Sequence, residues 1–385
     1  MDYGFTEEQV MIRDLARKIA VEKALPIRAH LDETGEFPWE VVKACAEANL
    51  TGIGIDEKYG GIGGGTLGYC IATEELSIIC GGIALAYAAT GLGTMPIILF
   101  GSEEQKQKYL PDIAAGKKLA AFGLTEANAG SDAAGMQTTA KKSGDYYILN
   151  GTKQWITNGG EAETYSVIAI TDRAKGSRGA SAFILEKNMP GFTFGKKENK
   201  MGIRASATRE LVFQDCKVHK SQLLGKEGMG FIVAMKTLDR TRPGIAAQAV
   251  GIAQGALNEA LKYSRERVQF GEKIGTFQAV QHMLADMATQ IEAARALVYA
   301  AARAIDNGSE ETSKISAMCK LFASDTCMRV TTDAVQIFGG YGYMKEYPVE
   351  KMMRDAKITQ IYEGTNQIQR NVIALELIKE MASKK

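Results

Sequence analysis

The order in which hydrophobic patterns follow one another along the 385 residues constrains the fold more than any other feature. Helical spacing runs through residues 6–120, strand patterns follow from residue 122, and helical spacing returns from about residue 235. Strands gathered between two helical regions predict an α+β multidomain protein, and not the alternating pattern of a doubly wound sheet. A chain of this length also exceeds what one hydrophobic core usually organises.

We therefore expect three domains. The first is an N-terminal α-helical domain over residues 1–121, and the second is a central β-domain of barrel or sandwich type over residues 122–234. The third, over residues 235–385, is a C-terminal helical domain that resembles a four-helix bundle, because its long helical stretches are separated by short breaks.

The strand patterns of the central region are short and lie close together. Residues 146–149 and 154–157 flank Asn150-Gly151, a dipeptide typical of a tight β-hairpin, so the sequence predicts a hairpin there. Residues 165–170, 181–185 and 209–213 are three more predicted strands.

Helix signals are clearest near the start and in the last third of the chain. Thr6 and Gln9 have the spacing of a capping box at a helix N-terminus. Further on, apolar residues recur at steps of three and four, at Met287, Ile291, Ala294, Val298 and Ala301. These positions predict one buried face of a long helix.

Charge and composition exclude several functional classes. The formal net charge is +1 and no long basic run exists, which argues against nucleic-acid and anionic-lipid partners. The six cysteines form no CxxC pair and predict buried, reduced thiols, while the three histidines lie far apart, so we expect no metal site. The N-terminus does not resemble a signal peptide, and no apolar run reaches the ~18 residues that span a bilayer, so we expect a cytoplasmic protein without membrane insertion.

One glycine-rich segment imitates a dinucleotide-binding motif. Residues 63–68 fit the pattern G-x-G-x-x-G, but no strand pattern precedes them. An acidic residue is also required about twenty positions on, where the chain has Ala88. We therefore interpret this segment as a flexible turn between helices.

Two further segments are candidates for binding, and each has a structural alternative. Residues 124–132 are rich in small and hydroxyl side chains, which suit contact with a polar heterocycle or a pyrophosphate but also suit an ordinary loop. Residues 336–343 include Gly339, Gly340 and Gly342, which let another group approach the backbone or simply end a helix.

A fourth segment offers a carboxylate. Glu363 is followed by Gly364 and lies between an aromatic residue and Thr365, which is placed to cap the next helix. The structural interpretation makes Glu363 a partner of the helix dipole. The chemical one makes it a general base whose pKa is raised by an apolar pocket.

In this order, the segments resemble the acyl-CoA dehydrogenase family over essentially the whole chain. Residues 124–132 are similar to its first signature, and residues 336–343 followed by 362–365 are similar to its second. Residues 155–159 and 267–271 match two more family landmarks. The sequence is most similar to the short- and medium-chain branch, that of the butyryl-CoA dehydrogenases. Ala127 departs from the pattern, which often has proline there, but no functional group is lost.

The resemblance implies three domains with FAD between the β-domain and the C-terminal bundle. It implies that the flavin contacts are made by Phe122, Leu124, Thr125, Ser131, Trp155 and Thr157. The far half of FAD would be held across a subunit interface by Arg267, Gln278, Gln336, Gly339 and Gly340, with further contacts from Thr365 and Gln367. The side of the cleft that binds the thioester would comprise Ser131, Asp239, Arg242 and Gly364.

The resemblance also implies the reaction. Glu363 would remove the α-proton of an acyl-CoA while FAD accepts the β-hydrogen, which gives a trans-2-enoyl-CoA. An electron-transferring flavoprotein would accept the electrons, and the enzyme would be a homotetramer built as a dimer of dimers. Some family members carry the base on another helix, at the position of Thr241, which cannot serve.

Three alternatives stay open. The first is a dehydrogenase of a cyclic or branched acyl-CoA, because the acyl pocket is not fixed by the motifs. The second is an acyl-CoA oxidase, although such chains are usually much longer. The third is an inactive acyl-CoA-binding scaffold, which should lack the carboxylate that Glu363 provides.

Overall fold

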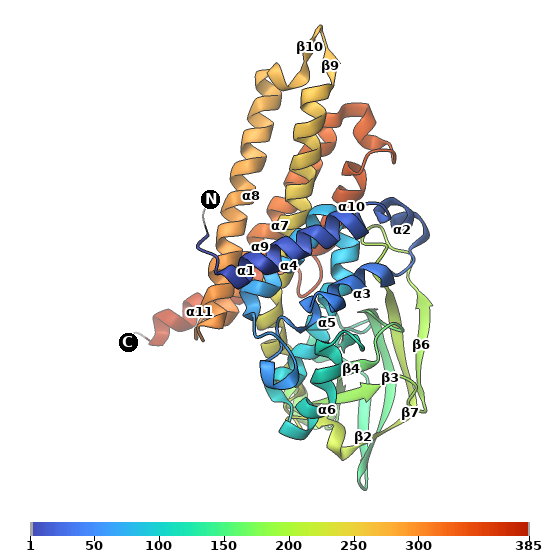
Figure 1. Cartoon of the computed structure of the whole chain (residues 1–385). Helices are drawn as coiled ribbons and strands as arrows, with labels where there is room; N and C mark the ends of the chain where they lie inside the picture. The colour runs from blue at the N-terminus through green and yellow to red at the C-terminus, as the bar shows by residue number, and fades with distance from the viewer. Residues whose placement is uncertain (1–2, 384–385) are drawn as a thin grey trace.

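The structure is a computed structural model that describes residues 3–383, and it confirms the predicted order of helices, sheet and helices (Figure 1). The N-terminal region comprises α1 (Glu7–Ile19), α2 (Arg28–Thr34), α3 (Trp39–Glu47), α4 (Gly65–Ile79), α5 (Gly81–Phe100) and α6 (Glu103–Ala114). The predicted capping box begins α1, since Gln9 N donates to Thr6 Oγ1 at 3.2 Å and Thr6 N donates to Gln9 Oε1 at 3.1 Å. The turn predicted for residues 63–68 is confirmed only at its start, because Gly63 and Gly64 precede α4 and residues 65–68 form the first turn of that helix.

Helix α5 is the one helix among residues 3–383 that is long and apolar enough to cross a membrane, with a mean hydropathy of 1.8 over 18 of its 20 residues. This corrects the expectation that no such stretch exists. Most of the helix is buried, because it packs between β1, β4, α4 and α7. Its apolar character is therefore that of a core helix.

The central region forms one mixed sheet beside these helices. Its strands are β1 (Ala120–Gly123), β2 (Thr139–Ser143), β3 (Tyr146–Thr157), β4 (Thr164–Ile170), β5 (Ala180–Glu186), β6 (Phe192–Lys197), β7 (Thr208–His219) and β8 (Leu223–Leu224). They lie in the order β6-β7-β3-β2-β4-β5-β8, and β1 pairs parallel with β4. The central strand β4 is buried along its whole length.

The predicted hairpin at Asn150-Gly151 is wrong. Residues 146–157 form the single strand β3, which pairs with β7 and carries register shifts after Leu149 and after Lys153. Gly151 adopts φ 140° at the first bulge, so the Asn-Gly signal marks a bulge and not a turn. The hairpin turn lies earlier, between Ser143 and Tyr146, and joins β2 to β3.

The C-terminal region is built from long helices that stand side by side in Figure 1. Its elements are α7 (Gly230–Glu266), β9 (Val268–Gln269), β10 (Glu272–Lys273), α8 (Gln278–Asp306), α9 (Thr312–Phe338), α10 (Val349–Thr359) and α11 (Asn366–Ser383). All five residues of the predicted helical stripe are buried in α8. The predicted domain limits fall inside β1 and α7, and they stay a prediction.

One hydrophobic cluster joins the first and last regions. It runs from α1 and α4 into α7, α8 and α9, and includes five of the six cysteines. All six cysteines are buried and unpaired by disulfides, as predicted. The N-terminal helices therefore fold against the bundle and do not form a detached domain.

A buried ion pair lies at this junction. Glu74 of α4 accepts from Arg295 Nε of α8 and from the Tyr299 hydroxyl, both at 2.7 Å. Burial raises the pKa of Glu74, and the ion pair with Arg295 opposes that shift. Removing only one partner of such a pair leaves an unpaired buried charge.

We predict that Arg295→Met lowers the melting temperature at neutral pH, because the loss of one partner of a buried ion pair costs roughly 3–5 kcal/mol. The double variant Glu74→Gln/Arg295→Met should recover most of the loss, because the charge of Glu74 is removed as well and Glu292, the other carboxylate paired with Arg295, keeps 32% of its side chain exposed. Thermal unfolding of both variants tests this. An unchanged melting temperature in the single variant would contradict the predicted role of the pair.

Candidate active site

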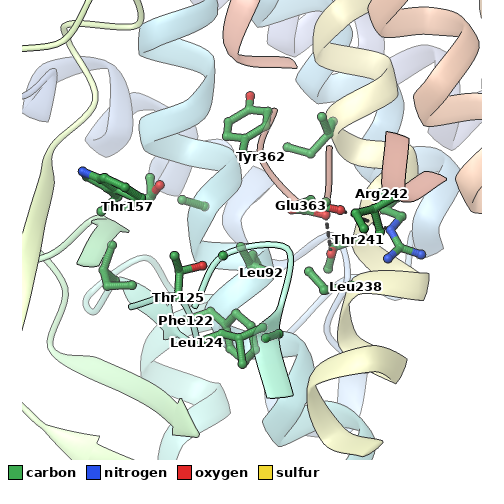
Figure 2. A pocket seen from close by; sticks show the side chains of 18 of the residues that line it. Leu92, Phe122, Leu124, Thr125, Thr157, Leu238, Thr241, Arg242, Tyr362 and Glu363 are labelled. Atoms are coloured by element: carbon green, nitrogen blue, oxygen red, sulfur yellow. Dashed lines mark hydrogen bonds between the residues drawn. The ribbon is translucent and has the colours of Figure 1, made fainter. Parts of the chain in front are cut away.

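A cavity of about 330 Å³ lies where the three regions meet. Its walls come from α4 and α5, from the loops that follow β1 and β3, from α7, and from the link between α10 and α11 (Figure 2). The lining residues include Tyr69, Leu85, Ala88, Ala89, Leu92, Phe122, Leu124, Thr125, Ser131, Trp155, Thr157, Leu238, Thr241, Arg242, Gly244, Ile245, Tyr362, Glu363 and Gly364. Most of the wall is apolar, and few charged groups reach it.

Glu363 lies in the link between α10 and α11 and faces this cavity. Its carboxylate accepts a hydrogen bond from the Thr241 hydroxyl at 2.8 Å, the dashed line in Figure 2. The backbone of Glu363 has φ 50°, which is uncommon for a residue with a side chain. Helix α11 begins directly afterwards, and Thr365 Oγ1 accepts from Ile368 N at 3.3 Å, which agrees with the capping role predicted for Thr365.

Hydrogen bonds from three side chains to backbone carbonyl groups hold the turn at Glu363 and Gly364 in place. Arg242 Nε and Gln369 Nε2 donate to Glu363 O at 3.3 and 3.2 Å. Lys320 Nζ donates to Gly364 O at 2.9 Å and to Asn366 Oδ1 at 2.9 Å. Among residues 3–383, no cationic side chain forms an ion pair with the Glu363 carboxylate. The two nearby cations therefore hold the backbone and leave the carboxylate free.

The environment shifts the acidity of Glu363. Burial raises its pKa to about 7, although the Thr241 hydrogen bond and the charges of Arg242 and Lys320 act in the opposite direction. Burial also lowers the pKa of Lys320 to about 7. Near neutral pH, Glu363 can therefore gain or lose a proton, as a general base must.

The four residues predicted on the thioester side separate into two groups. Ser131, Arg242 and Gly364 line the cavity. Asp239 lies outside its lining and binds Arg242 Nη1 at 2.9 Å. Asp239 thus fixes the guanidinium of Arg242 and does not face the cavity itself.

The residues predicted along the flavin form the opposite wall. Phe122 lies in β1, Leu124 and Thr125 follow that strand, and Trp155 and Thr157 are at the end of β3. Trp155 sits at the second bulge of β3 with φ 57° and has 56% of its surface exposed. Because a bulge redirects a side chain, the indole lies at the cavity and not within the sheet.

A buried ion pair shapes the loop of the first signature. Lys153 Nζ donates to Glu126 Oε1 at 2.7 Å and to Leu124 O at 3.0 Å. The same carboxylate accepts from the backbone N–H groups of Gln137 and Thr138. These bonds hold both ends of the loop, so Thr125 and Ser131 keep their places at the cavity.

The remaining predicted cofactor residues lie elsewhere. Arg267, Gly339 and Gly340 line a separate cavity of about 540 Å³ between the end of α7 and the end of α9, and no residue lines both cavities. Gln278 and Gln336 are exposed and line neither cavity. Gln367 is exposed on α11. Within one chain, the structure therefore does not bring Arg267, Gln278, Gln336, Gly339 and Gly340 to Glu363, whereas Gln367 lies four residues after it.

Comparison with known proteins gives the same family for each of the three regions of the chain. The N-terminal, middle and C-terminal domains of acyl-CoA dehydrogenase match residues 6–117, 121–216 and 228–378. The chain belongs to the acyl-CoA dehydrogenase family. It is 52% identical to the short-chain specific acyl-CoA dehydrogenase of Clostridium acetobutylicum over 381 residues, which cover 98% of this chain and 100% of the relative.

Solved structures agree with this assignment. Butyryl-CoA dehydrogenase from Megasphaera elsdenii is 51% identical, with a TM-score of 0.96 and coverage of 98% of this chain and 100% of that one. A chain in a structure described as the electron transferring flavoprotein of Acidaminococcus fermentans is 55% identical, with a TM-score of 0.96 and coverage of 98% and 99%. The acyl-CoA dehydrogenases are FAD-dependent oxidoreductases, and so is this enzyme.

The cavity of this acyl-CoA dehydrogenase suits a flavin ring. A flat ring needs an apolar face and a few polar groups at its edge. Trp155 and Phe122 supply aromatic surface, and the hydroxyls of Thr125 and Thr157 supply polar groups on the same wall. The exposed indole of Trp155 is an unpartnered flat surface that a planar cofactor would cover.

Two residues that lie at the site were not identified from the sequence. Lys320 is a lone lysine within an apolar stretch of α9, and this pattern could have predicted a buried charged side chain. Tyr69 lines the cavity from α4, where nothing in the helical pattern distinguishes it. Ala88 and Leu92 of α5 also line the cavity, while Tyr87 of the same helix is buried and is not part of the lining.

We predict that infrared difference spectra of the FAD-loaded enzyme contain a protonated carboxyl band that disappears with a midpoint near pH 7 as the pH rises. The band should be missing in Glu363→Gln. Thr241→Val should move the midpoint to higher pH, because the Thr241 hydrogen bond favours the carboxylate. A downward move, or a midpoint near the usual glutamate value of about 4.3, would contradict this account of the pocket.

Proposed function

We propose that this enzyme dehydrogenates a short- or medium-chain acyl-CoA to the trans-2-enoyl-CoA. The observation that carries the proposal is the half-buried carboxylate of Glu363, which has a pKa of about 7 and faces an apolar cavity opposite the wall formed by Trp155 and Thr157. The similarity to a short-chain specific dehydrogenase and to butyryl-CoA dehydrogenase supports the choice of substrate.

Glu363 is the proposed general base. Its carboxylate takes the α-proton next to the thioester carbonyl, and the Thr241 hydroxyl keeps the carboxylate in place. Bound FAD supplies the two-electron acceptor for the β-hydrogen. The apolar lining excludes water, which keeps the pKa of the base high and strengthens electrostatic interactions with the substrate.

The carbonyl oxygen of the substrate gains negative charge as the proton leaves. The backbone N–H of Glu363 donates no hydrogen bond to any acceptor within residues 3–383, so it is free to stabilise this charge. A donor of this kind typically contributes about 3 kcal/mol. Ser131, Arg242 and Gly364 line the same cavity and are the proposed contacts of the thioester side.

The second cavity supports a proposal about assembly. Arg267, Gly339 and Gly340 line it far along the bundle, near the β9–β10 hairpin (Figure 1). We propose that these residues, with Gln278 and Gln336, hold the far half of a neighbouring subunit's FAD in a homotetramer built as a dimer of dimers. Thr365 and Gln367 at the start of α11 are proposed to add cofactor contacts.

An electron-transferring flavoprotein is the proposed electron acceptor. Its support is the 55% identity to a chain in a structure described by that name. Because α5 is buried in the core, we also propose that the enzyme works in the cytoplasm without membrane insertion. A cyclic or branched acyl group, an oxidase and an inactive scaffold remain the alternatives for this site.

We predict that butyryl-CoA bleaches the flavin of the purified enzyme under anaerobic conditions. Reoxidation should be rapid with an electron-transferring flavoprotein and slow with oxygen alone. A matched series of straight, branched and cyclic acyl-CoAs identifies the acyl class. Rapid reoxidation by oxygen would favour an oxidase, and a flavin that no acyl-CoA bleaches would favour a scaffold.

A further inference from the structure

The inner end of the main cavity is closed by an aromatic ring. Gly130 and Ser131 are exposed and mark the outer side, while Leu85, Ala88 and Ala89 of α5 are buried and mark the inner side. Tyr69 reaches the same inner side from α4. The three α5 residues that mark the inner side are all apolar, so this side of the cavity is an apolar wall.

The ring of Tyr69 occupies a slot between two helices. A Cβ atom on Gly91 of α5 would lie 2.6 Å from Tyr69 Oη and 2.8 Å from Cζ. A Cβ atom on Gly244 of α7 would lie 2.9 Å from Tyr69 Cε1. Such distances are too short for real contacts, so the ring fits only because both helices have glycine where it passes.

Other contacts fix the ring in this slot. The Tyr69 hydroxyl donates to the carbonyl of Ala88, which itself lines the cavity. The ring also stacks on Tyr87, with centroids 6.0 Å apart and planes 28° apart. Tyr87 is anchored in turn, because its hydroxyl donates to Leu50 O at 2.9 Å. Tyr69 is therefore a rigid end wall and not a side chain that swings aside.

We propose that Tyr69, held between Gly91 and Gly244, is the specificity-determining residue that limits the length of the acyl chain. An acyl group whose thioester lies at Glu363 extends toward the apolar end and meets the ring of Tyr69. The inference rests on the proposed function, since it assigns the end wall of the same acyl-CoA site. It restricts that function to short acyl chains.

The test compares Tyr69→Ala with the matched control Tyr69→Phe in the FAD-loaded enzyme. For each variant, kcat/KM is measured with butyryl-, hexanoyl- and octanoyl-CoA and an artificial electron acceptor. Tyr69→Ala removes the wall, so the ratio of octanoyl- to butyryl-CoA kcat/KM should rise at least ~10-fold, the effect typical of one methylene in an apolar pocket. Tyr69→Phe keeps the ring, so its ratio should stay near that of the unsubstituted enzyme.

A second variant keeps the test decisive if Tyr69→Ala does not fold. Tyr69→Leu leaves a shorter apolar side chain, so the same ratio should rise by less but in the same direction. In addition, Gly91→Ala should lower kcat/KM for butyryl-CoA because it crowds the ring, and this loss should disappear in the Tyr69→Ala background.

The outcomes separate this inference from the proposed function. If no acyl-CoA reduces the flavin of the unsubstituted enzyme, the proposed function fails. If butyryl-CoA reduces it but the chain-length ratio is the same in Tyr69→Ala, Tyr69→Leu and the unsubstituted enzyme, the proposed function stands and the role of Tyr69 is overturned.

Discussion

The hydrogen bond between Thr241 and Glu363 is the interaction on which the account of this site depends. A carboxylate in an apolar cavity prefers to be protonated, and a close cation would instead make it too weak a base. Here the neutral hydroxyl of Thr241 holds the carboxylate, while Arg242 and Lys320 bind the carbonyls of the turn.

The raised pKa also affects stability. Because the pKa of Glu363 in the folded state exceeds that of an unfolded glutamate, Glu363 stabilises the fold most at low pH, and this contribution is lost as the pH rises through about 7.

Helix α7 connects this site to the rest of the molecule. It carries Thr241 and Arg242 on the face that meets Glu363, and Gly244 one turn away where the ring of Tyr69 passes. The same helix packs against α4, α5 and α9, so the base, the end wall and the core share one rigid element. The sheet contributes the opposite wall, because the bulges of β3 place Trp155 at the cavity. The cavity is therefore formed by the three regions together, and no single region encloses it.

Sequence patterns predicted the architecture well, because helical and strand periodicity report local burial. They predicted the stripe of α8 and the cap of α1, but the Asn150-Gly151 pair was misread, since its glycine serves a bulge set by pairing with β7. Glu363 and the residues expected along the flavin were both selected from motifs, and in the structure they line one cavity. They could not place Asp239 behind Arg242 or identify Tyr69, because both depend on how helices distant in sequence pack. Nor can a single chain show what Arg267 contacts, since that role requires a second subunit.

The central claim is that Glu363 is the base, and the most direct measurement is stopped-flow bleaching of the flavin under anaerobic conditions in Glu363→Gln. The account predicts that this variant keeps FAD and binds acyl-CoA, because the amide preserves shape and polarity, but bleaches at least ~10²–10⁴-fold more slowly. Glu363→Asp should retain some activity, with its carboxylate set back from the α-carbon. A Gln variant that bleaches at nearly the rate of the unsubstituted enzyme would show that the base lies elsewhere.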